Sequence, residues 1–122
     1  MENNISVRKQ DNTGIITCRG AIDSDTYRTF KDSLGNLIES GIYKIVIVLS
    51  DISFMNSTGW GTIIGNLRNV RQKKGDIVLA AMNENLKTTY YRTNFDEIIK
   101  AYDTIEDALS SFSSEIPEQR DR

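Results

Sequence analysis

The junction around which this chain is organised spans residues 45–65 and reads IVIVLSDISFMNSTGWGTIIG. Its first five residues form the most apolar run of the chain and predict a buried strand. From Trp60 onward the apolar residues recur at helical spacing, so a helix is expected after a short loop. Asn56, Ser57 and Thr58 then lie at a helix N-terminus, where backbone N–H groups lack partners within the helix. Such a site can hold an anion, or acquire negative charge through phosphorylation.

Length and composition indicate the number of domains and the kinds of partner to expect. The 122 residues suit one domain, which can bury roughly two-thirds of its unfolded surface. The 15 basic and 17 acidic residues leave a net charge of −2 and favour neither nucleic acid nor an anionic membrane as a partner. No apolar run approaches the ~20 residues of a membrane span, and residues 1–4 carry no signal segment. We therefore expect a cytoplasmic protein with no nucleic-acid or membrane partner.

The residue types present restrict the chemistry. Histidine is absent, which excludes Ser-His triads, Cys-His dyads and nearly every common zinc site. The single cysteine, Cys18, lies in an apolar run and cannot form an intrachain disulfide, so we expect a buried structural thiol. We expect no enzyme activity, no cofactor and no bound metal.

The first part of the chain predicts a hairpin followed by a helix. Residues 5–9 alternate between apolar and polar, a turn follows, and residues 15–20 resume as a second strand. Asp23 or Ser24 is a suitable cap for the next helix, and Gly41 stops it. The apolar stripe of this helix consists of Tyr27, Phe30, Leu34, Leu37 and Ile38.

The rest of the chain alternates between strands and helices. The predicted elements are a buried strand at residues 43–49, a helix from 57 to about 74, a strand at 76–82, a short helix from 84 to about 94 capped by Asn83, a strand at 95–102 and a helix from about 105 to 112. This alternation implies a largely parallel sheet.

Three glycines of the second helix carry specific expectations. Gly61 and Gly65 lie one helical turn apart and would allow close approach of a backbone, more often that of the sheet than that of a partner. Gly75 is expected to end the helix as its C′ residue.

Nearly the whole chain, up to about Phe112, resembles the STAS domain family, and within it the bacterial anti-sigma factor antagonists. The resemblance rests on the opening hairpin, on GAIDSDT at residues 20–26, on LSDISFMNSTG at 49–59, on the buried strand after Gly75 and on EDAL at 106–109. It implies an α/β, STAS-like fold: a mixed, largely parallel sheet with an N-terminal antiparallel hairpin and about four helices. One domain is expected at residues 1–113, followed by a frayed polar tail at 114–122.

The resemblance also implies a regulatory site. The chain has two junctions between a strand and a helix, at residues 20–26 and 49–59. In the family, the second junction surrounds a phosphoacceptor. Carried over to this chain, the acceptor is Ser57, with Thr58 as second choice, and Asp23 is its acidic neighbour. The implied partner-binding residues are Asp23, Asp25, Asn56, Ser57, Thr58, Gly59 and Trp60. Two of them depart from the family pattern: Asn56 stands where Asp is usual, and Trp60 where a smaller aliphatic residue is usual.

The partners follow from the same resemblance. The family's typical partner is a serine-kinase anti-sigma factor, which uses ATP to phosphorylate the antagonist, and a phosphatase reverses the modification. The unmodified antagonist sequesters the kinase and thereby frees the sigma factor.

Three other interpretations remain open at this point. The polar residues at the junction could merely cap a helix. The chain could be a scaffold subunit of a signalling assembly whose switch is not modified, which Asn56 leaves open. It could also be a small nucleotide- or metal-binding enzyme, since the glycines at 59, 61 and 65 faintly resemble a phosphate-binding loop, and Asp23, Asp25 and Asp51 could form an acidic metal pocket.

Overall fold

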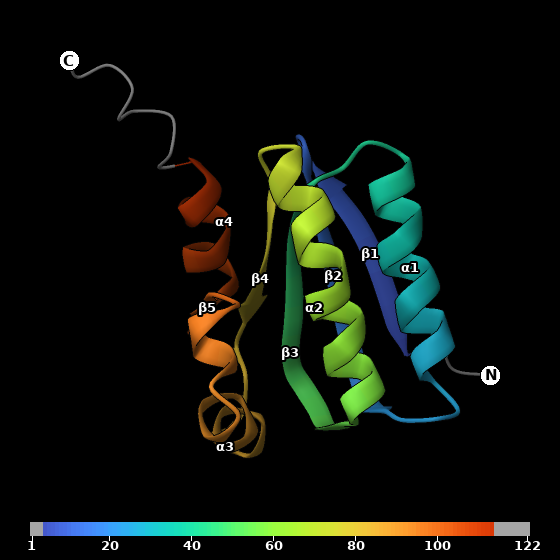
Figure 1. Ribbon diagram of the computed structural model, residues 1–122, viewed down its shortest axis with the longest axis vertical. Helices are drawn as coiled ribbons and strands as arrows, with labels where there is room; N and C mark the ends of the chain where they lie inside the picture. Colours follow the sequence, from blue (N-terminus) through green and yellow to red (C-terminus); the bar gives the residue numbers. More distant parts are fainter. Residues whose placement is uncertain (1–3, 114–122) are drawn as a thin grey trace.

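The computed structural model describes residues 4–113 as one mixed five-stranded sheet with helices on both faces (Figure 1). Its elements are β1 (Ile5–Gln10), β2 (Thr13–Ile22), α1 (Tyr27–Glu39), β3 (Lys44–Met55), α2 (Ser57–Gln72), β4 (Asp76–Ala80), α3 (Glu84–Arg92), the 3-10 helix η1 (Phe95–Glu97), β5 (Ala101–Tyr102) and α4 (Ile105–Ser113). The strand order is β1-β2-β3-β4-β5. Only the β1–β2 pair is antiparallel among these strands, which confirms the predicted fold class. The expected tail at residues 114–122 lies outside the described residues.

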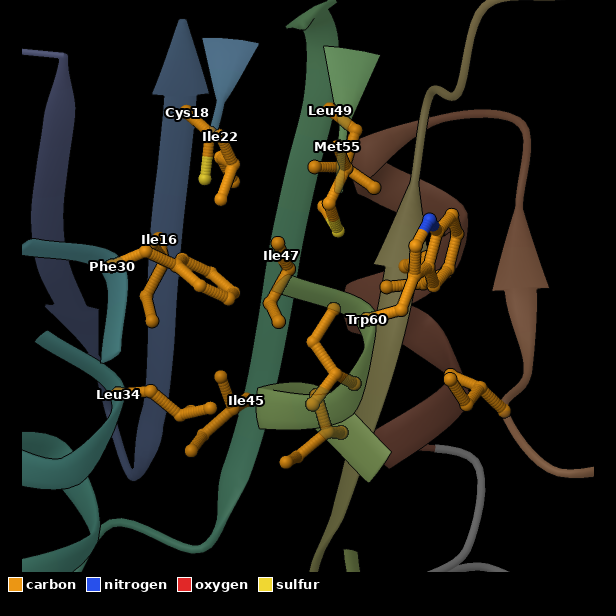
Figure 2. Close-up of a cluster of buried hydrophobic side chains, with 14 of the residues drawn as sticks. Ile16, Cys18, Ile22, Phe30, Leu34, Ile45, Ile47, Leu49, Met55 and Trp60 are labelled. Carbon is orange, nitrogen blue, oxygen red and sulfur yellow. The ribbon is translucent and has the colours of Figure 1, made fainter. Parts of the chain in front are cut away.

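The core is divided by the sheet into two layers. Ile16, Ile45 and Ile47 pack with the buried faces of α1 and α2 (Figure 2). Their neighbours Ile15 and Val46 point the other way and pack against α4. Successive residues of a strand face opposite sides of a sheet, so β3 is buried on both faces, as its unbroken apolar run predicts.

The predicted loop after residue 49 is wrong, because β3 continues to Met55. The register with β2 includes two irregularities and still pairs Arg19 with Asp51 and Ile22 with Met55. The polar residues that suggested a loop, Ser50 and Asp51, lie in this strand with exposed side chains. β3 therefore leads directly into the cap of α2.

The predicted strand at residues 95–102 is also wrong over most of its length. Asn94 adopts a left-handed conformation with φ 61°, and η1 follows it. Only Ala101 and Tyr102 pair with β4. The buried hydroxyl of Tyr90 donates to the carbonyl oxygen of Ile99 and ties the end of this segment to α3.

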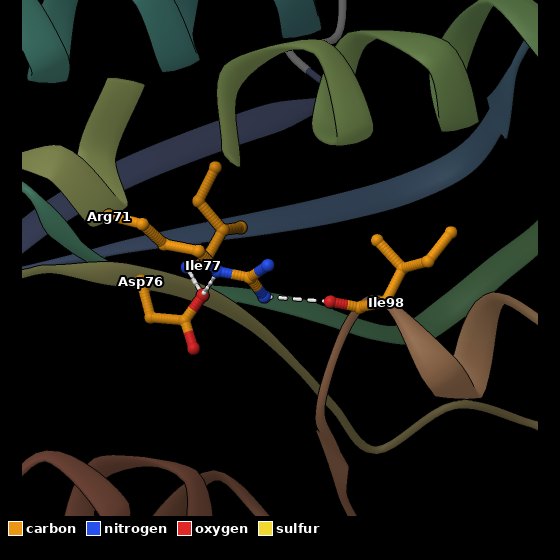
Figure 3. A network of polar contacts seen from close by, with 4 residues as sticks. All are labelled: Arg71, Asp76, Ile77 and Ile98. Atoms are coloured by element: carbon orange, nitrogen blue, oxygen red, sulfur yellow. Dashed lines mark hydrogen bonds and ion pairs between the residues drawn. The ribbon is translucent and has the colours of Figure 1, made fainter. Parts of the chain in front are cut away.

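Arg71 fastens the end of α2 to this segment (Figure 3). Its Nε donates to Oδ1 of Asp76 at 2.9 Å, and its Nη2 donates to the carbonyl oxygen of Ile98 at 2.7 Å. One guanidinium thus connects α2, the start of β4 and the chain after η1.

Two helix ends differ from expectation, the start of α1 and the end of α2. The N-cap of α1 is Thr26 rather than Asp23 or Ser24. Lys74, with φ 68°, takes the left-handed position after α2 that was assigned to Gly75. Gly75 is instead required for close packing, since a Cβ there would lie 1.9 Å from the carbonyl oxygen of Tyr43.

The expectation that Gly61 and Gly65 admit the sheet backbone is wrong. A Cβ on either residue would have no neighbour within 4 Å, and both glycines are exposed on α2. Within residues 4–113, no helix is long and apolar enough to cross a membrane.

Replacing Gly75 by alanine should destabilise the fold, because the new methyl group collides with backbone rather than with a flexible side chain. We expect Gly75→Ala to lower the free energy of unfolding by at least about 2 kcal/mol in urea denaturation. The matched control is Gly65→Ala, which has open space and should raise it by about 0.5–1 kcal/mol. Equal stability of the two variants would contradict this account of Gly75.

The thiol of Cys18 should be inert in the folded protein. The side chain is fully buried, and burial raises its pKa from 9.0 to about 12. The stability tied to this neutral thiol is complete below pH ~9 and is lost as the pH rises toward ~12. We expect negligible reaction with Ellman's reagent at pH 8 and rapid reaction in urea. The control is a Cys18→Ala, Ser110→Cys variant, which should react at once when folded because Ser110 is exposed. Equally fast labelling of Cys18 in the native protein would show that its thiol is not inert.

Candidate functional site

The site lies where β2 and β3 end side by side. Ile22 pairs with Met55, and the backbone N–H of Asn56 donates to the carbonyl oxygen of Ile22 at 2.9 Å. Asp23 and Asn56 are the next residues beyond the carboxyl ends of these parallel strands. The fold therefore places the two junctions of the sequence, which lie more than thirty residues apart, at one edge of the sheet.

Asn56 starts α2. Its backbone is extended, with ψ 174°, and its side-chain oxygen accepts a hydrogen bond from the N–H of Gly59 at 2.9 Å. Ser57 and Thr58 are the first two residues of this 16-residue helix, and both side chains are exposed. The hydroxyl of Ser57 thus stands at the positive end of a helix dipole.

Asp23 is held by the turn that follows β2. Its carboxylate accepts hydrogen bonds from the backbone N–H of Asp25 at 2.9 Å and of Thr26 at 3.1 Å. These bonds lower the pKa of Asp23 below its ordinary value, so the group is negatively charged at neutral pH. The hydroxyl of Thr26 donates to the carbonyl oxygen of Ala21 at 2.6 Å and ties the turn back to the strand. Asp25 beside it is exposed.

Two of the predicted site residues are buried. A Cβ at Gly59 would lie 2.6 Å from Cγ of Met55, so glycine is needed where α2 crosses the end of β3. Trp60 is only 3% exposed, and its ring packs against Phe95 with centroids 5.0 Å apart. These two residues support the surface from below, whereas the side chains of Asp23, Asp25, Asn56, Ser57 and Thr58 reach solvent in whole or in part.

A groove beside Ser57 was not foreseen from the sequence. It has a volume of about 520 Å³ and lies between the first turns of α2, the end of β3 and the α3–η1 segment. Phe54, which is 53% exposed, forms one wall. The available signal was Phe54, a large apolar residue close to the polar residues Asn56 and Ser57.

The structure does not form the two motifs that suggested an enzyme, an acidic metal pocket and a phosphate-binding glycine loop. Residues 4–113 contain no cluster of three or more His, Cys, Asp or Glu side chains that could hold a metal ion, so Asp23, Asp25 and Asp51 do not form one. Gly61 and Gly65 lie within α2 rather than in a loop, and their N–H groups therefore cannot cradle a phosphate.

The fold and the site together define a small mixed α/β domain with one polar, serine-bearing edge. The profile of the STAS domain family matches residues 4–108, and the chain belongs to this family.

Named relatives agree with this membership. A candidate anti-sigma factor antagonist of Thermotoga neapolitana is 38% identical over 72 residues, which cover 59% of this chain and 64% of that protein's length. The anti-sigma-B factor antagonist of Bacillus subtilis is 29% identical over 99 residues, covering 81% of this chain and 90% of that one. The crystal structure of a candidate anti-sigma factor antagonist from Thermotoga maritima is similar with a TM-score of 0.81, at 27% identity over 88% of this chain and 92% of the other.

Asn56 should act as a cap that aspartate can replace. We expect Asn56→Ala to lower the free energy of unfolding by about 1 kcal/mol, because the N–H of Gly59 loses its acceptor. Asn56→Asp keeps the acceptor and adds charge at the helix N-terminus, so its stability should match or slightly exceed that of the wild type. Urea denaturation of the three proteins measures this, and an Asp variant as unstable as the Ala variant would show that the cap requires the amide.

Proposed function

We propose that this protein is an anti-sigma factor antagonist: unmodified, it binds a serine-kinase anti-sigma factor, and phosphorylation of Ser57 releases it. The observation that carries the proposal is the exposed hydroxyl of Ser57 at the first residue of α2, next to the charged turn of Asp23. The names of the Thermotoga and Bacillus relatives support the same role.

The position of Ser57 allows phosphorylation without unfolding. A phosphoserine adds about −1.5 to −2 charges. At the start of α2 this charge faces free backbone N–H groups, a favourable interaction of about 0.3–1 kcal/mol when exposed. Since the side chain of Ser57 is already in solvent, the fold should tolerate the modification.

For a partner packed over Ser57, the same phosphate is unfavourable. It must remove water from a phosphate dianion, and it does so close to the carboxylates of Asp23 and Asp25. A penalty of about 4 kcal/mol would lower the affinity roughly a thousandfold. The switch therefore acts at the interface.

The remaining steps belong to the partners. The anti-sigma factor carries the ATP site and transfers the phosphoryl group to the Ser57 oxygen, and a phosphatase restores the hydroxyl. While the antagonist is bound, the sigma factor is free.

One observation favours a second candidate, a STAS scaffold subunit without a phospho-switch. Asn56 caps α2 through its side-chain oxygen and brings no negative charge beside Ser57. A kinase that requires an acidic residue at this position would not phosphorylate this chain. The chain would still present the same surface to a partner.

The two candidates differ in the fate of Ser57. Incubation with the cognate serine-kinase anti-sigma factor and ATP, followed by peptide mass spectrometry, should place one phosphate on Ser57 and none on Ser57→Ala, while the control Thr58→Ala is modified like the wild type. Ser57→Asp should weaken binding of that kinase by about 10- to 100-fold, because it adds one charge rather than two. Both Ser57 variants should unfold within about 0.5 kcal/mol of the wild type. If the kinase binds but leaves Ser57 unmodified, the protein is a scaffold subunit without a phospho-switch.

A further inference from the structure

The groove beside Ser57 is formed by residues from several elements of the fold. Its walls include Phe54 from the end of β3, Ile64 from α2 and Phe95 from η1, while Ser57 and Gly61 line the same space. α3 and the start of α2 lie at the same end of the sheet (Figure 1). The apolar wall and the proposed phosphoacceptor therefore belong to one continuous surface.

The floor of the groove is held in place from several sides. Trp60 is buried beneath it and packs on Phe95. Asn83 caps α3 by accepting from the N–H of Leu86, and its amide nitrogen donates to the carbonyl oxygen of Ile52, so α3 is tied to β3. Arg71 holds the chain after η1 through Ile98. A partner would meet a preformed pocket and lose little binding free energy in ordering it.

The apolar surface extends beyond this pocket. A second hollow shares Ile64 with the first and continues along α2. Its lining is mixed: Ile64, Leu67 and Ile98 are apolar, whereas Arg68, Arg71 and Gln72 are charged or polar. The partly exposed apolar side chains of this flank are Phe54, Ile64, Phe95 and Ile98, of which Ile98 is 41% exposed. Contiguous apolar patches of this kind mark interaction sites, whereas single exposed apolar residues do not.

The charges around the Ser57 end indicate what kind of partner fits. Asp25 is exposed in the turn after β2, and the carboxylate of Asp23 in the same turn accepts hydrogen bonds from backbone N–H groups. A partner segment that complements this end must bring basic residues to this turn and an apolar group to the groove.

We propose that the groove receives an apolar side chain of the anti-sigma factor, from a segment whose neighbouring basic residues face Asp23 and Asp25. This inference rests on the proposed function and identifies how the partner is held. Anchors of this type, buried in a pocket at the centre of an interface, carry most of the binding free energy.

The same geometry couples the anchor to phosphorylation. Because Ser57 and Phe54 line one pocket, a phosphate on Ser57 would place a dianion at the mouth of an apolar site. The entering side chain would have to displace the water that solvates this phosphate. Phosphorylation would then oppose the strongest contact of the interface.

Two exposed glycines provide a matched test. Gly61 lines the groove, and Gly65, one turn further along α2, does not. A Cβ on either residue meets nothing within 4 Å, so a side chain can be added at both positions without a clash at its first carbon, and leucine favours the helix. We expect Gly61→Leu to fill the groove and weaken binding of the purified anti-sigma factor by about thirtyfold or more. Gly65→Leu should bind within about twofold of the wild type, as for contacts outside the anchor.

Two further measurements make the result specific. Phe54→Ala removes an exposed wall and should also weaken binding by at least about tenfold. Trp60 is the only tryptophan of the chain, so 5-fluorotryptophan labelling gives one ¹⁹F resonance beneath the groove. Adding the anti-sigma factor should shift this resonance in the wild type and in Gly65→Leu.

The outcomes separate this inference from the function on which it rests. If the wild type binds and Ser57→Asp does not, yet Gly61→Leu binds like Gly65→Leu, the groove is not the anchor site and the switch survives. If the wild type binds no anti-sigma factor, the proposed function fails. If the protein alone is a dimer that Gly61→Leu dissociates, the occupant is a second copy of this chain and the inference is overturned.

Discussion

The pairing of β2 with β3 to the last residue of each strand is the constraint on which the site depends. The carbonyl oxygen of Ile22 accepts from the N–H of Asn56, and Asn56 in turn caps α2. One residue therefore bonds to the end of β2 and starts the helix. The turn of Asp23 begins at the same point of β2. Two segments far apart in sequence are thereby fixed at one edge, and the hydroxyl of Ser57 is left outside the core.

The periodic parts of the fold could be predicted from the sequence, because they follow from burial. The apolar run of β3 contributes to both core layers, and the stripe of α1 packs in one of them. The cap of α2 at Asn56 could be predicted because capping chemistry is local, whereas the role of Ser57 follows from the resemblance and stays a prediction.

The errors arise where a distant contact overrides local composition. The polar residues from Ser50 onward suggest a loop, but pairing with β2 keeps them extended. Gly75 is needed because Tyr43 lies against it, and Lys74 accepts the left-handed backbone instead. The segment after Asn94 has apolar residues suited to a strand, yet hydrogen bonds from Tyr90 and Arg71 hold it in another path. The groove depends on several such elements at once, so the exposed Phe54 alone could not predict it.

Different side chains stabilise the domain and its proposed complex. Trp60 and Met55 are buried beneath the Ser57 surface, whereas the hydroxyl of Ser57, where the proposed charge change would occur, is exposed at the start of α2. The most direct test measures two quantities on protein phosphorylated at Ser57 and on the unmodified protein: the free energy of unfolding, and the affinity for the anti-sigma factor. The account predicts unfolding free energies that agree within about 1 kcal/mol and an affinity roughly a thousandfold lower after phosphorylation. Equal affinities of the two forms, or a phosphorylated domain that no longer folds, would contradict it.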